Sequence, residues 1–151
     1  MENFHIRQCT LDDIDAIFQL ESEWEQEGVS YEFVPVRRSE FIAQFERFQQ
    51  YHLVAESGAN IIGYVNGSIR QGDKSAIIPA QAPYLEVENI YIRSEFRNKE
   101  IGGRLLKRLL EIARKNGIQR FFISTVTKDM DKIINFYRSH GFKPWYVEMF
   151  I

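Results

Sequence analysis

The stretch RNKEIGGRLL at positions 97–106 has the residue types of an anion-binding site. It is typical of a turn that closes on the start of a helix, where the first backbone N–H groups lack helical partners and the helix dipole adds partial positive charge. Gly102 and Gly103 allow a ligand to approach the backbone closely. Basic side chains around them are Arg97, Lys99 and Arg104. The stretch therefore predicts a phosphate-binding cradle, with an ordinary strand-to-helix turn as the alternative reading.

Glu100 stands where such a cradle is expected to carry a further glycine. The stretch has no Gly-Lys-Ser/Thr ending and no Gly-x-Gly-x-x-Gly, so neither a Walker loop nor the dinucleotide fingerprint fits. A cradle works mainly through main-chain N–H groups, which a glutamate also has. We therefore expect residue 100 to keep a negative φ and to point its carboxylate to solvent, where it would oppose a bound pyrophosphate.

Histidine and cysteine residues offer little further chemistry. His5, His52 and His140 lie at the edges of predicted strands or helices, without partners at metal-ligand spacing. We therefore expect no metal site. Cys9 lies in a short apolar run and is expected to be a buried packing residue rather than a nucleophile.

Hydrophobic periodicity and turn residues predict the elements that position these residues. Strands are expected at 4–9, 51–57, 60–71, 84–92, 120–126 and 142–151, and helices at 10–28, 39–50, 101–116 and 129–141. Residues 71–83, which include two prolines and a glycine, are expected to form a loop. The strand-helix-strand crossover from 84–92 through 101–116 to 120–126 predicts a parallel pair in a mixed sheet.

The composition favours one globular domain over residues 1–151. The chain has 151 residues, a formal net charge of −2 and a sequence pI near 6.0. No overall positive field would draw it to nucleic acid or to an anionic membrane. We see no basic flank with an apolar core at the start and no apolar window of about 18 to 20 residues, so the expected location is cytoplasmic.

The cradle resembles the acetyl-CoA signature of the GNAT superfamily of N-acetyltransferases. In that signature, Arg/Gln-x-x-Gly-x-Gly/Ala follows a strand directly, and residues 97–102 match it except for Glu100 at the first glycine. A second segment, INFYRSHGF at 134–142, resembles the family's Tyr-x-x-x-Gly-Phe segment. The element order β-α-α-β-β-β-α-β-α-β also fits the family fold. The resemblance implies an α/β fold of the mixed α+β kind, whose sheet is mostly antiparallel with one parallel splayed pair.

The resemblance also implies where acetyl-CoA would bind as cosubstrate. Backbone groups of Ile90, Tyr91 and Ile92 would pair with the pantetheine arm like an added strand. Main-chain amides of the cradle would hold the pyrophosphate, and the residues concerned are Asn98, Lys99, Glu100, Ile101, Gly102 and Gly103. Family members often carry an asparagine seven residues before their tyrosine, and Met130 occupies that position here.

Acetyl transfer to a primary amine in a ternary complex is the implied activity, and it needs the amine in its neutral form. Glu88 resembles the base of polyamine-type members, with Glu86 as second candidate and a water chain as a possible link. Tyr137 resembles the family's general acid for the departing thiolate. The alternatives are polar residues on a wet strand face for the glutamates and a packed aromatic for the tyrosine.

The acceptor is expected to be a small cationic molecule. Helix 10–28 ends in Glu21, Glu23, Glu25 and Glu27, which would attract a cationic amine or simply form a solvated face. Two other functions stay open, namely a non-catalytic acyl-CoA-binding or regulatory domain and an enzyme acting on a protein N-terminus or lysine. The apolar end at 145–151 suggests a homodimer.

Overall fold

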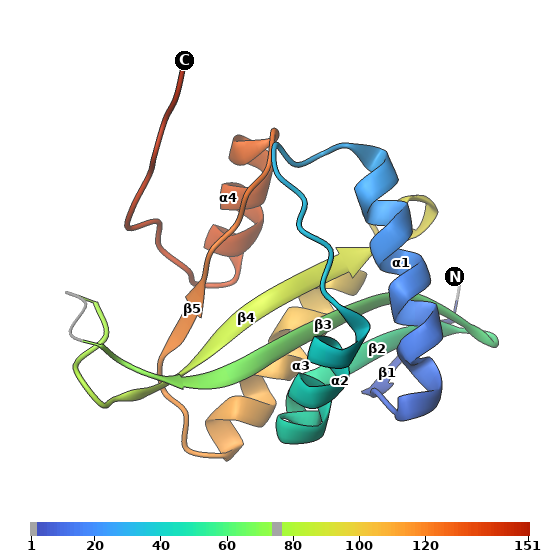
Figure 1. The fold of residues 1–151 in the computed structure, drawn as a ribbon, viewed down its shortest axis with the longest axis horizontal. Helices are drawn as coiled ribbons and strands as arrows, with labels where there is room; N and C mark the ends of the chain where they lie inside the picture. Colours follow the sequence, from blue (N-terminus) through green and yellow to red (C-terminus); the bar gives the residue numbers. More distant parts are fainter. Residues whose placement is uncertain (1–2, 74–76) are drawn as a thin grey trace.

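The structure is a computed structural model that describes residues 3–73 and 77–151, so residues 74–76 of the predicted 71–83 loop lie outside it. A five-stranded sheet has the order β1-β2-β3-β4-β5, and Figure 1 shows it lying between helices. The strands are β1 His5–Gln8, β2 His52–Ser57, β3 Asn60–Gln71, β4 Pro83–Ile92 and β5 Phe121–Ile123. The helices are α1 Ile14–Glu27, α2 Arg38–Arg47, α3 Ile101–Lys115 and α4 Met130–Ser139, and short 3-10 helices are η1 Leu11–Asp13, η2 Gln49–Tyr51 and η3 Ser94–Phe96.

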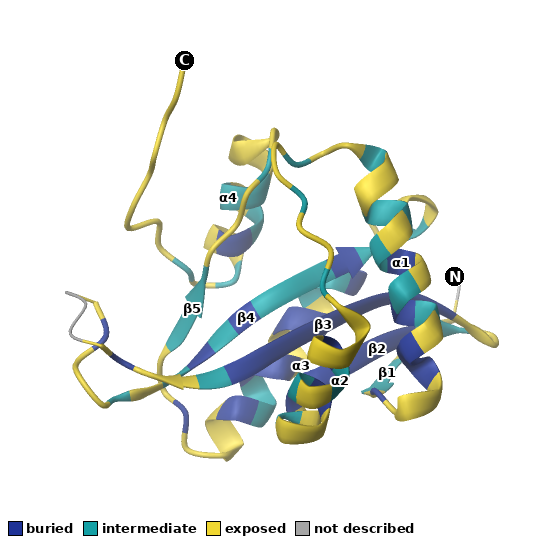
Figure 2. Ribbon diagram, viewed as in Figure 1, coloured by how far each residue is buried: buried dark blue, intermediate teal, exposed yellow. Residues whose placement is uncertain are grey.

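The two faces of the sheet carry separate apolar cores, because successive side chains of a strand point to opposite sides. On one face α3 packs its apolar side, including Leu105 and Leu109, against Leu53 of β2 and Val65 of β3. On the other face α1 and α2 pack against the intervening strand residues, and Figure 2 shows the buried middle of the sheet between them. The predicted mixed sheet is confirmed: β4 and β5 run parallel, and the other neighbours run antiparallel.

A β-bulge lies in the middle of β4. Asn66 of β3 is opposite Asn89, and the next residue, Gly67, is opposite Val87, so Glu88 has no cross-strand partner. The bulge reverses the alternation, because Val87 and Ile90 both pack in the α3 core although they are three residues apart. Tyr91 is buried in the core beneath α1 and α2.

The parallel pair β4–β5 is short and opens after the bulge. Its register covers Leu85↔Phe121, Glu86↔Phe122 and Val87↔Ile123. Within the described residues, the part of β4 from Glu88 onward therefore pairs with β3 alone. Apart from the Ile92 carbonyl, to which Arg97 donates, its other edge keeps main-chain N–H and C=O groups available, which is the kind of edge that an extended ligand can join.

The last predicted strand, at 142–151, is wrong, and the strand predicted at 120–126 is shorter than expected. The chain after Gly141 runs along no sheet edge, and Figures 1 and 2 show it as an exposed, extended end. From Lys143 onward its side chains are exposed, including Met149 at 90%. Alternating apolar residues fit a strand, but a strand also needs a hydrogen-bonding partner, which the pattern does not supply.

Two ion pairs fix the acidic end of α1 to the end of β4. Arg93 donates to both carboxylate oxygens of Glu23 at 2.8 and 2.9 Å. Arg97 donates to Glu27 at 2.7 Å, and Tyr91 donates its hydroxyl to the same carboxylate oxygen at 2.6 Å. The acidic helix end is therefore largely a docking face for this corner rather than a solvated surface.

Glu21 lies on the sheet side of α1, where it accepts a hydrogen bond from the hydroxyl of Tyr64. Burial raises the pKa of the Glu21 carboxyl from 4.5 to about 7. Between pH 4.5 and about 7, the folded protein thus keeps a proton on Glu21 that the unfolded chain has released. Its contribution to stability is complete below pH 4.5 and is lost as pH rises through about 7.

We predict that Glu21→Gln flattens this pH dependence, because glutamine does not titrate. Relative to the variant, the wild type should lose up to about 3 kcal/mol of unfolding free energy across the interval. Urea denaturation at about pH 5 and about pH 8 measures the difference. Glu25→Gln, an exposed change on the same helix, is the control and should keep the wild-type slope. Equal slopes for Glu21→Gln and the wild type would contradict the raised pKa.

Candidate functional site

The turn before α3 has an unusual backbone. Asn98 and Glu100 both adopt positive φ, at 61° and 62°. The expectation that residue 100 keeps a negative φ is therefore wrong, although its side chain is exposed as expected. A left-handed conformation costs an L residue about 1–2 kcal/mol, whereas glycine adopts it freely, which is the physical reason for a glycine at this position. Glu100 caps α3, and its carbonyl accepts the N–H of Arg104 at 3.0 Å.

The main chain at the start of α3 is closely surrounded. The N–H groups of Ile101, Gly102 and Gly103 precede the first intrahelical bond and so are free to bind an anion. A Cβ on Gly102 would lie 3.5 Å from Ile92 and 3.7 Å from Phe136, which are ordinary contacts. The end of β4, the start of α3 and α4 therefore meet at Gly102.

Gly103 is more constrained than Gly102. A Cβ at this position would lie 2.8 Å from Nε2 of His140, so any larger residue would displace that ring. His140 is itself held through Nδ1, which lies 2.8 Å from the carbonyl oxygen of Phe136. The glycine thus allows α4 to approach the start of α3.

The three basic side chains of the cradle all lie over aromatic rings. Arg97 turns back toward β4, where it donates to the carbonyl of Ile92 at 2.8 Å and lies over the ring of Tyr91. The Lys99 ammonium lies 5.2 Å from the centre of the Phe96 ring, and the Arg104 guanidinium lies 4.6 Å from that of Phe4. Arg97 in particular positions the corner between β4 and α1. Because these side chains are held by aromatic rings and by β4, the backbone amides at the start of α3 are the main candidate groups for binding an anion.

Glu88, the predicted base, lies at the bulge and accepts three hydrogen bonds. Ser68 donates its hydroxyl at 2.5 Å, Gln44 of α2 donates its amide, and Arg70 forms an ion pair at 3.3 Å. Its side chain is 18% exposed. Glu86 binds the same arginine, so the two glutamates share one cation on one face of β4.

The partners of Glu88 were not identified from the sequence. A signal was present, because Asn66, Ser68 and Arg70 alternate along a strand that is otherwise largely apolar. Period-two spacing places all three on the face that carries Glu88. Gln44 gave no comparable signal, since a glutamine on an amphipathic helix is ordinary.

Tyr137, the predicted acid, is a buried residue of α4. Its ring makes edge contacts with Phe136 and Phe142, at centroid distances of 5.1 and 5.6 Å. Burial raises the pKa of its hydroxyl well above the ordinary value. The hydroxyl therefore carries its proton at neutral pH and can donate it in a hydrogen bond. Both the packing role and the acid role are compatible with this environment.

Met130, which replaces the family's frequent asparagine, is exposed at the first position of α4. Asp129 caps that helix, since its side chain accepts the N–H of Lys132 at 3.3 Å. Over the described parts of the chain, no group of three or more His, Cys, Asp or Glu side chains is arranged to hold a metal ion. Over the same parts, no helix has the length and apolarity needed to cross a bilayer.

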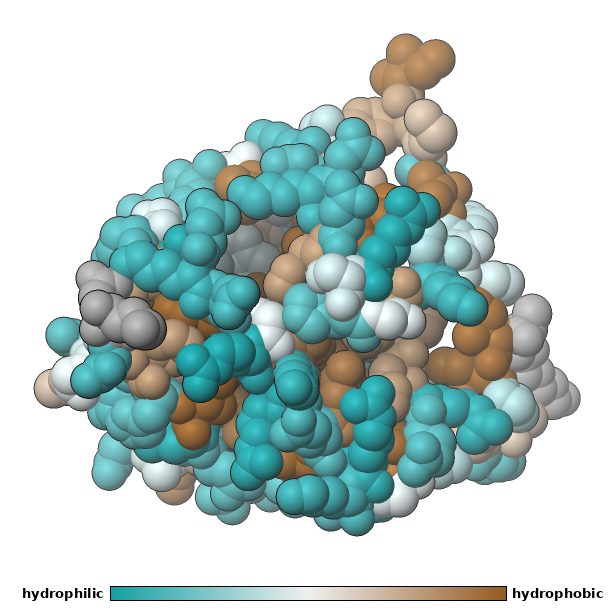
Figure 3. All heavy atoms as spheres, turned by 180° about the vertical axis from the view of Figure 1, so that it is seen from behind, coloured by the Kyte–Doolittle hydropathy of each residue, from teal (hydrophilic) through white to brown (hydrophobic). Residues whose placement is uncertain are grey.

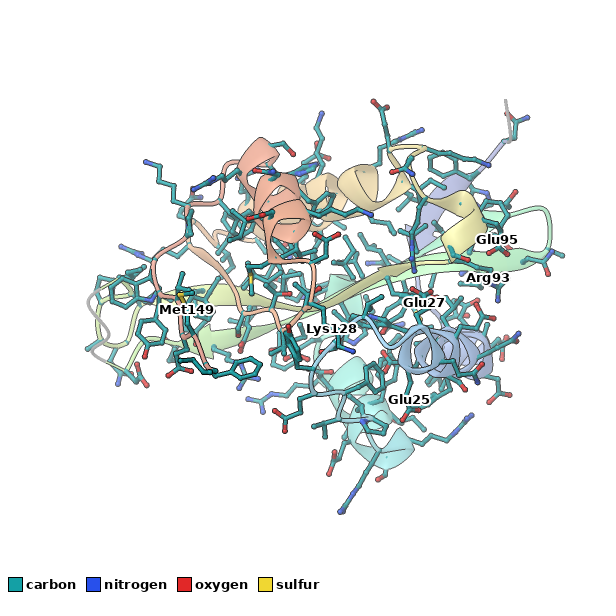
Figure 4. The ribbon with its side chains drawn as sticks, turned by 90° about the horizontal axis from the view of Figure 1, so that it is seen from above. Glu25, Glu27, Arg93, Glu95, Lys128 and Met149 are labelled. Atoms are coloured by element: carbon teal, nitrogen blue, oxygen red, sulfur yellow. The ribbon has the colours of Figure 1, made fainter. Side chains whose placement is uncertain are left out.

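A hollow of about 560 Å³ lies between α1 and the end of β4, away from Glu88 and Tyr137. Figure 4 shows Glu27, Arg93 and Glu95 around this corner. Its lining residues are Gln19, Glu23, Gln26, Glu27, Tyr91, Arg93, Ser94 and Glu95. The lining includes Glu23 and Glu27, the two carboxylates of α1 that are ion-paired at this corner. We therefore assign the hollow to the packing contact between α1 and the end of β4.

Solved structures share this fold at low sequence identity. An aminoglycoside N-acetyltransferase, AAC(6')-Iy in complex with CoA, aligns with a TM-score of 0.74 and 17% identity over 99% of this chain and 93% of its own. A transcriptional regulator from Bacillus halodurans C-125 aligns at 0.75 and 19%, over 99% of both chains. Glucosamine-6-phosphate N-acetyltransferase from Arabidopsis thaliana aligns at 0.70 and 19%, over 99% of this chain and 98% of its own.

Sequence comparison is more specific than fold. The chain is 26% identical over 142 residues to an amino-acid acetyltransferase of Aeromonas salmonicida (strain A449), covering 94% of this chain but 27% of that protein. The chain thus spans about a quarter of the length of that relative. A sequence profile described as "Acetyltransferase (GNAT) family" matches residues 14–142, which include the cradle, Glu88 and Tyr137. The chain therefore belongs to the GNAT family of acetyltransferases.

Proposed function

We propose that this protein transfers an acetyl group from acetyl-CoA to the primary amine of a small cationic molecule, by direct attack in a ternary complex. The observation that carries the proposal is the opening of the β4–β5 pair beside the start of α3. It leaves a free strand edge that leads to a cluster of free amides. The thioester arm of acetyl-CoA needs the strand edge, and the pyrophosphate that follows it needs the amides.

The cofactor would lie along this path. Main-chain groups of Ile90, Tyr91 and Ile92 would pair with the pantetheine arm, and the amides from Asn98 to Gly103 would hold the pyrophosphate. The bound thioester supplies the activated acetyl group. The residues of this chain would then orient it, and orientation alone can lower a reaction barrier by about 7–11 kcal/mol.

Glu88 would accept the proton of the amine, directly or through water, because it lies at the bulge where the free edge of β4 begins. Glu86, which shares Arg70 with it, is the second candidate. Tyr137 would donate a proton to the departing thiolate, because its hydroxyl is protonated at neutral pH.

The proposed acceptor class rests on the carboxylates near the bulge. Aminoglycoside and glucosamine-6-phosphate acetyltransferases share the fold. Here Glu86 and Glu88 are paired with Arg70, whose side chain is 53% exposed. A cationic amine can replace an exposed arginine at a carboxylate with little loss of ion pairing. A small cationic acceptor therefore fits this site.

Thermal shift with acetyl-CoA, CoA and ATP tests the cofactor assignment. We expect both CoA species to raise the melting temperature by several degrees at about 100 times their dissociation constants, and ATP to have a smaller effect. CoA release across a panel of polyamines, aminoglycosides, amino acids and lysine peptides then identifies the acceptor. No stabilisation by either CoA species would overturn the proposal. Binding without turnover on any amine would favour a regulatory acyl-CoA-binding domain.

Substitution of the two catalytic candidates tests their roles. Glu88→Gln should lower kcat/KM by about a hundredfold or more, because the amine loses its base. Tyr137→Phe should lower kcat without raising KM, because the hydroxyl acts on the leaving group. Glu86→Gln is the matched comparison on the same strand. If Glu86→Gln abolishes turnover and Glu88→Gln does not, the base is Glu86.

Two substitutions at Glu100 separate backbone strain from charge. Glu100→Gly should be more stable than Glu100→Gln by about 1 kcal/mol, because glycine alone relieves the positive φ. Both variants remove a carboxylate beside the proposed pyrophosphate site, so both should bind CoA more tightly, most clearly at low salt. Urea denaturation and calorimetry measure the two effects. Equal stability of the variants would contradict the strain, and unchanged affinity in both would contradict the charge effect.

A further inference from the structure

A set of polar side chains is buried on the sheet face beneath α2, behind Glu88. Asn66 is 0% exposed, His52 is 1% exposed and Ser68 is 3% exposed. Burying such groups costs free energy unless each polar atom has a hydrogen-bond partner. Ser68 has one in Glu88. The other two each retain a buried polar atom to which no described protein group is bonded, namely Nε2 of His52 and Oδ1 of Asn66.

The state of His52 follows from its partner. Its Nδ1 lies 3.0 Å from the carbonyl oxygen of Phe48, which can only accept, so Nδ1 carries the hydrogen. The ring makes edge contacts with Phe41 and Phe45 at 5.6 and 5.4 Å, and burial lowers its pKa below 6.5. His52 is therefore neutral at pH 7, and its Nε2 is an acceptor.

The orientation of Asn66 follows from Glu88. The carboxylate can only accept, so Gln44 must turn its amide nitrogen to Glu88 and its oxygen toward Asn66. The Asn66 amide nitrogen points to that oxygen, at 3.5 Å. Its own oxygen is then left as an acceptor. Rotating the amide of Asn66 would place two oxygens against each other.

The two remaining acceptors belong to directly opposed residues. His52 of β2 and Asn66 of β3 are cross-strand partners, and such residues have Cβ atoms about 4.5–5.5 Å apart. Two acceptors cannot satisfy each other. A water molecule has two hydrogens and can donate one to each. Such a water would complete a chain from His52 through Asn66 and Gln44 to Glu88.

We propose that His52 and Asn66 hold a buried water between them, and that this chain positions Gln44 as a fixed donor to the Glu88 carboxylate. The proposal rests on the proposed function, in which Glu88 is the base. Gln44, Asn66 and His52 are then positioning residues. They hold the carboxylate from the protein interior, whereas the half-exposed Arg70 covers its solvent side.

Several charged groups face Glu88, and the test must keep them unchanged. Arg70 pairs with both Glu88 and Glu86, and His52 interacts with Glu88 through its charge when protonated. A hydrogen bond to a charged carboxylate favours its charged form. Loss of the Gln44 donor should therefore move the titration of the Glu88 carboxyl to higher pH, even with these neighbours intact.

Carbon-13 NMR of carboxyl-labelled glutamate measures that titration in the protein without acyl donor or amine. We expect Gln44→Met to move the Glu88 midpoint upward by about half a pH unit, a threefold change in the ionisation constant. Asn66→Leu should move it in the same direction, although Asn66 does not touch Glu88, because Gln44 loses its own donor. The double variant should match Gln44→Met alone. Gln50→Met, an exposed change of the same type, should leave the midpoint unchanged.

The wild type provides a second readout that needs no variant to fold. Nitrogen-15 spectra of the His52 ring should show the neutral form with its hydrogen on Nδ1. A hydrogen on Nε2, or a Glu88 midpoint that does not respond to Asn66→Leu, would overturn the chain, as would additive shifts in the double variant. If amines are acetylated, the acidic limb of kcat/KM should move with the midpoint. Lack of turnover with an intact NMR result would reject the proposed function alone.

Discussion

The separation of β4 from β5 is the constraint on which the rest of the site depends. The two strands are parallel neighbours, but their register ends at Val87. The bulge at Glu88 follows at once, and bulges bend strands and increase their twist. One change of geometry thus frees a strand edge and turns a carboxylate away from the regular alternation. It also lets α3 begin beside that edge and brings α4 to the same corner.

Intramolecular ion pairs hold the surroundings of this opening in place. Arg93 and Arg97 leave the end of β4 and bind Glu23 and Glu27 of α1, in a contact that also includes the hydroxyl of Tyr91. Isolated surface pairs contribute little to stability, but a bidentate contact beside a buried aromatic is better defined geometrically. Their role here is to fix the position of α1 against the sheet. Figure 3 shows the molecule from behind, on the side away from α1 and α2. That surface is mostly hydrophilic, and the apolar chain end projects beyond it.

The candidate base lies in a layer of polar side chains whose burial costs desolvation free energy. Glu88 has donors from a helix and from the neighbouring strand, and behind them lie Asn66 and His52, which the sheet and α2 bury almost completely. Buried polar networks of this kind are costly when incomplete and strongly orienting when complete. An exposed carboxylate would need no such network. The arrangement therefore favours a role for the orientation of Glu88.

The sequence by itself determined the family, the mixed sheet and the order of the elements up to α4. It did so because periodicity, caps and the glycines at the start of α3 are local properties of the chain. Only the tertiary structure decided the bulge at Glu88, the positive φ of Glu100 and the absence of the predicted strand at 142–151. It also decided that Gln44 reaches Glu88 and that Asn66 lies behind Gln44. These features depend on which segments meet, and a hydrogen-bond partner from another strand or helix leaves no mark in the local pattern.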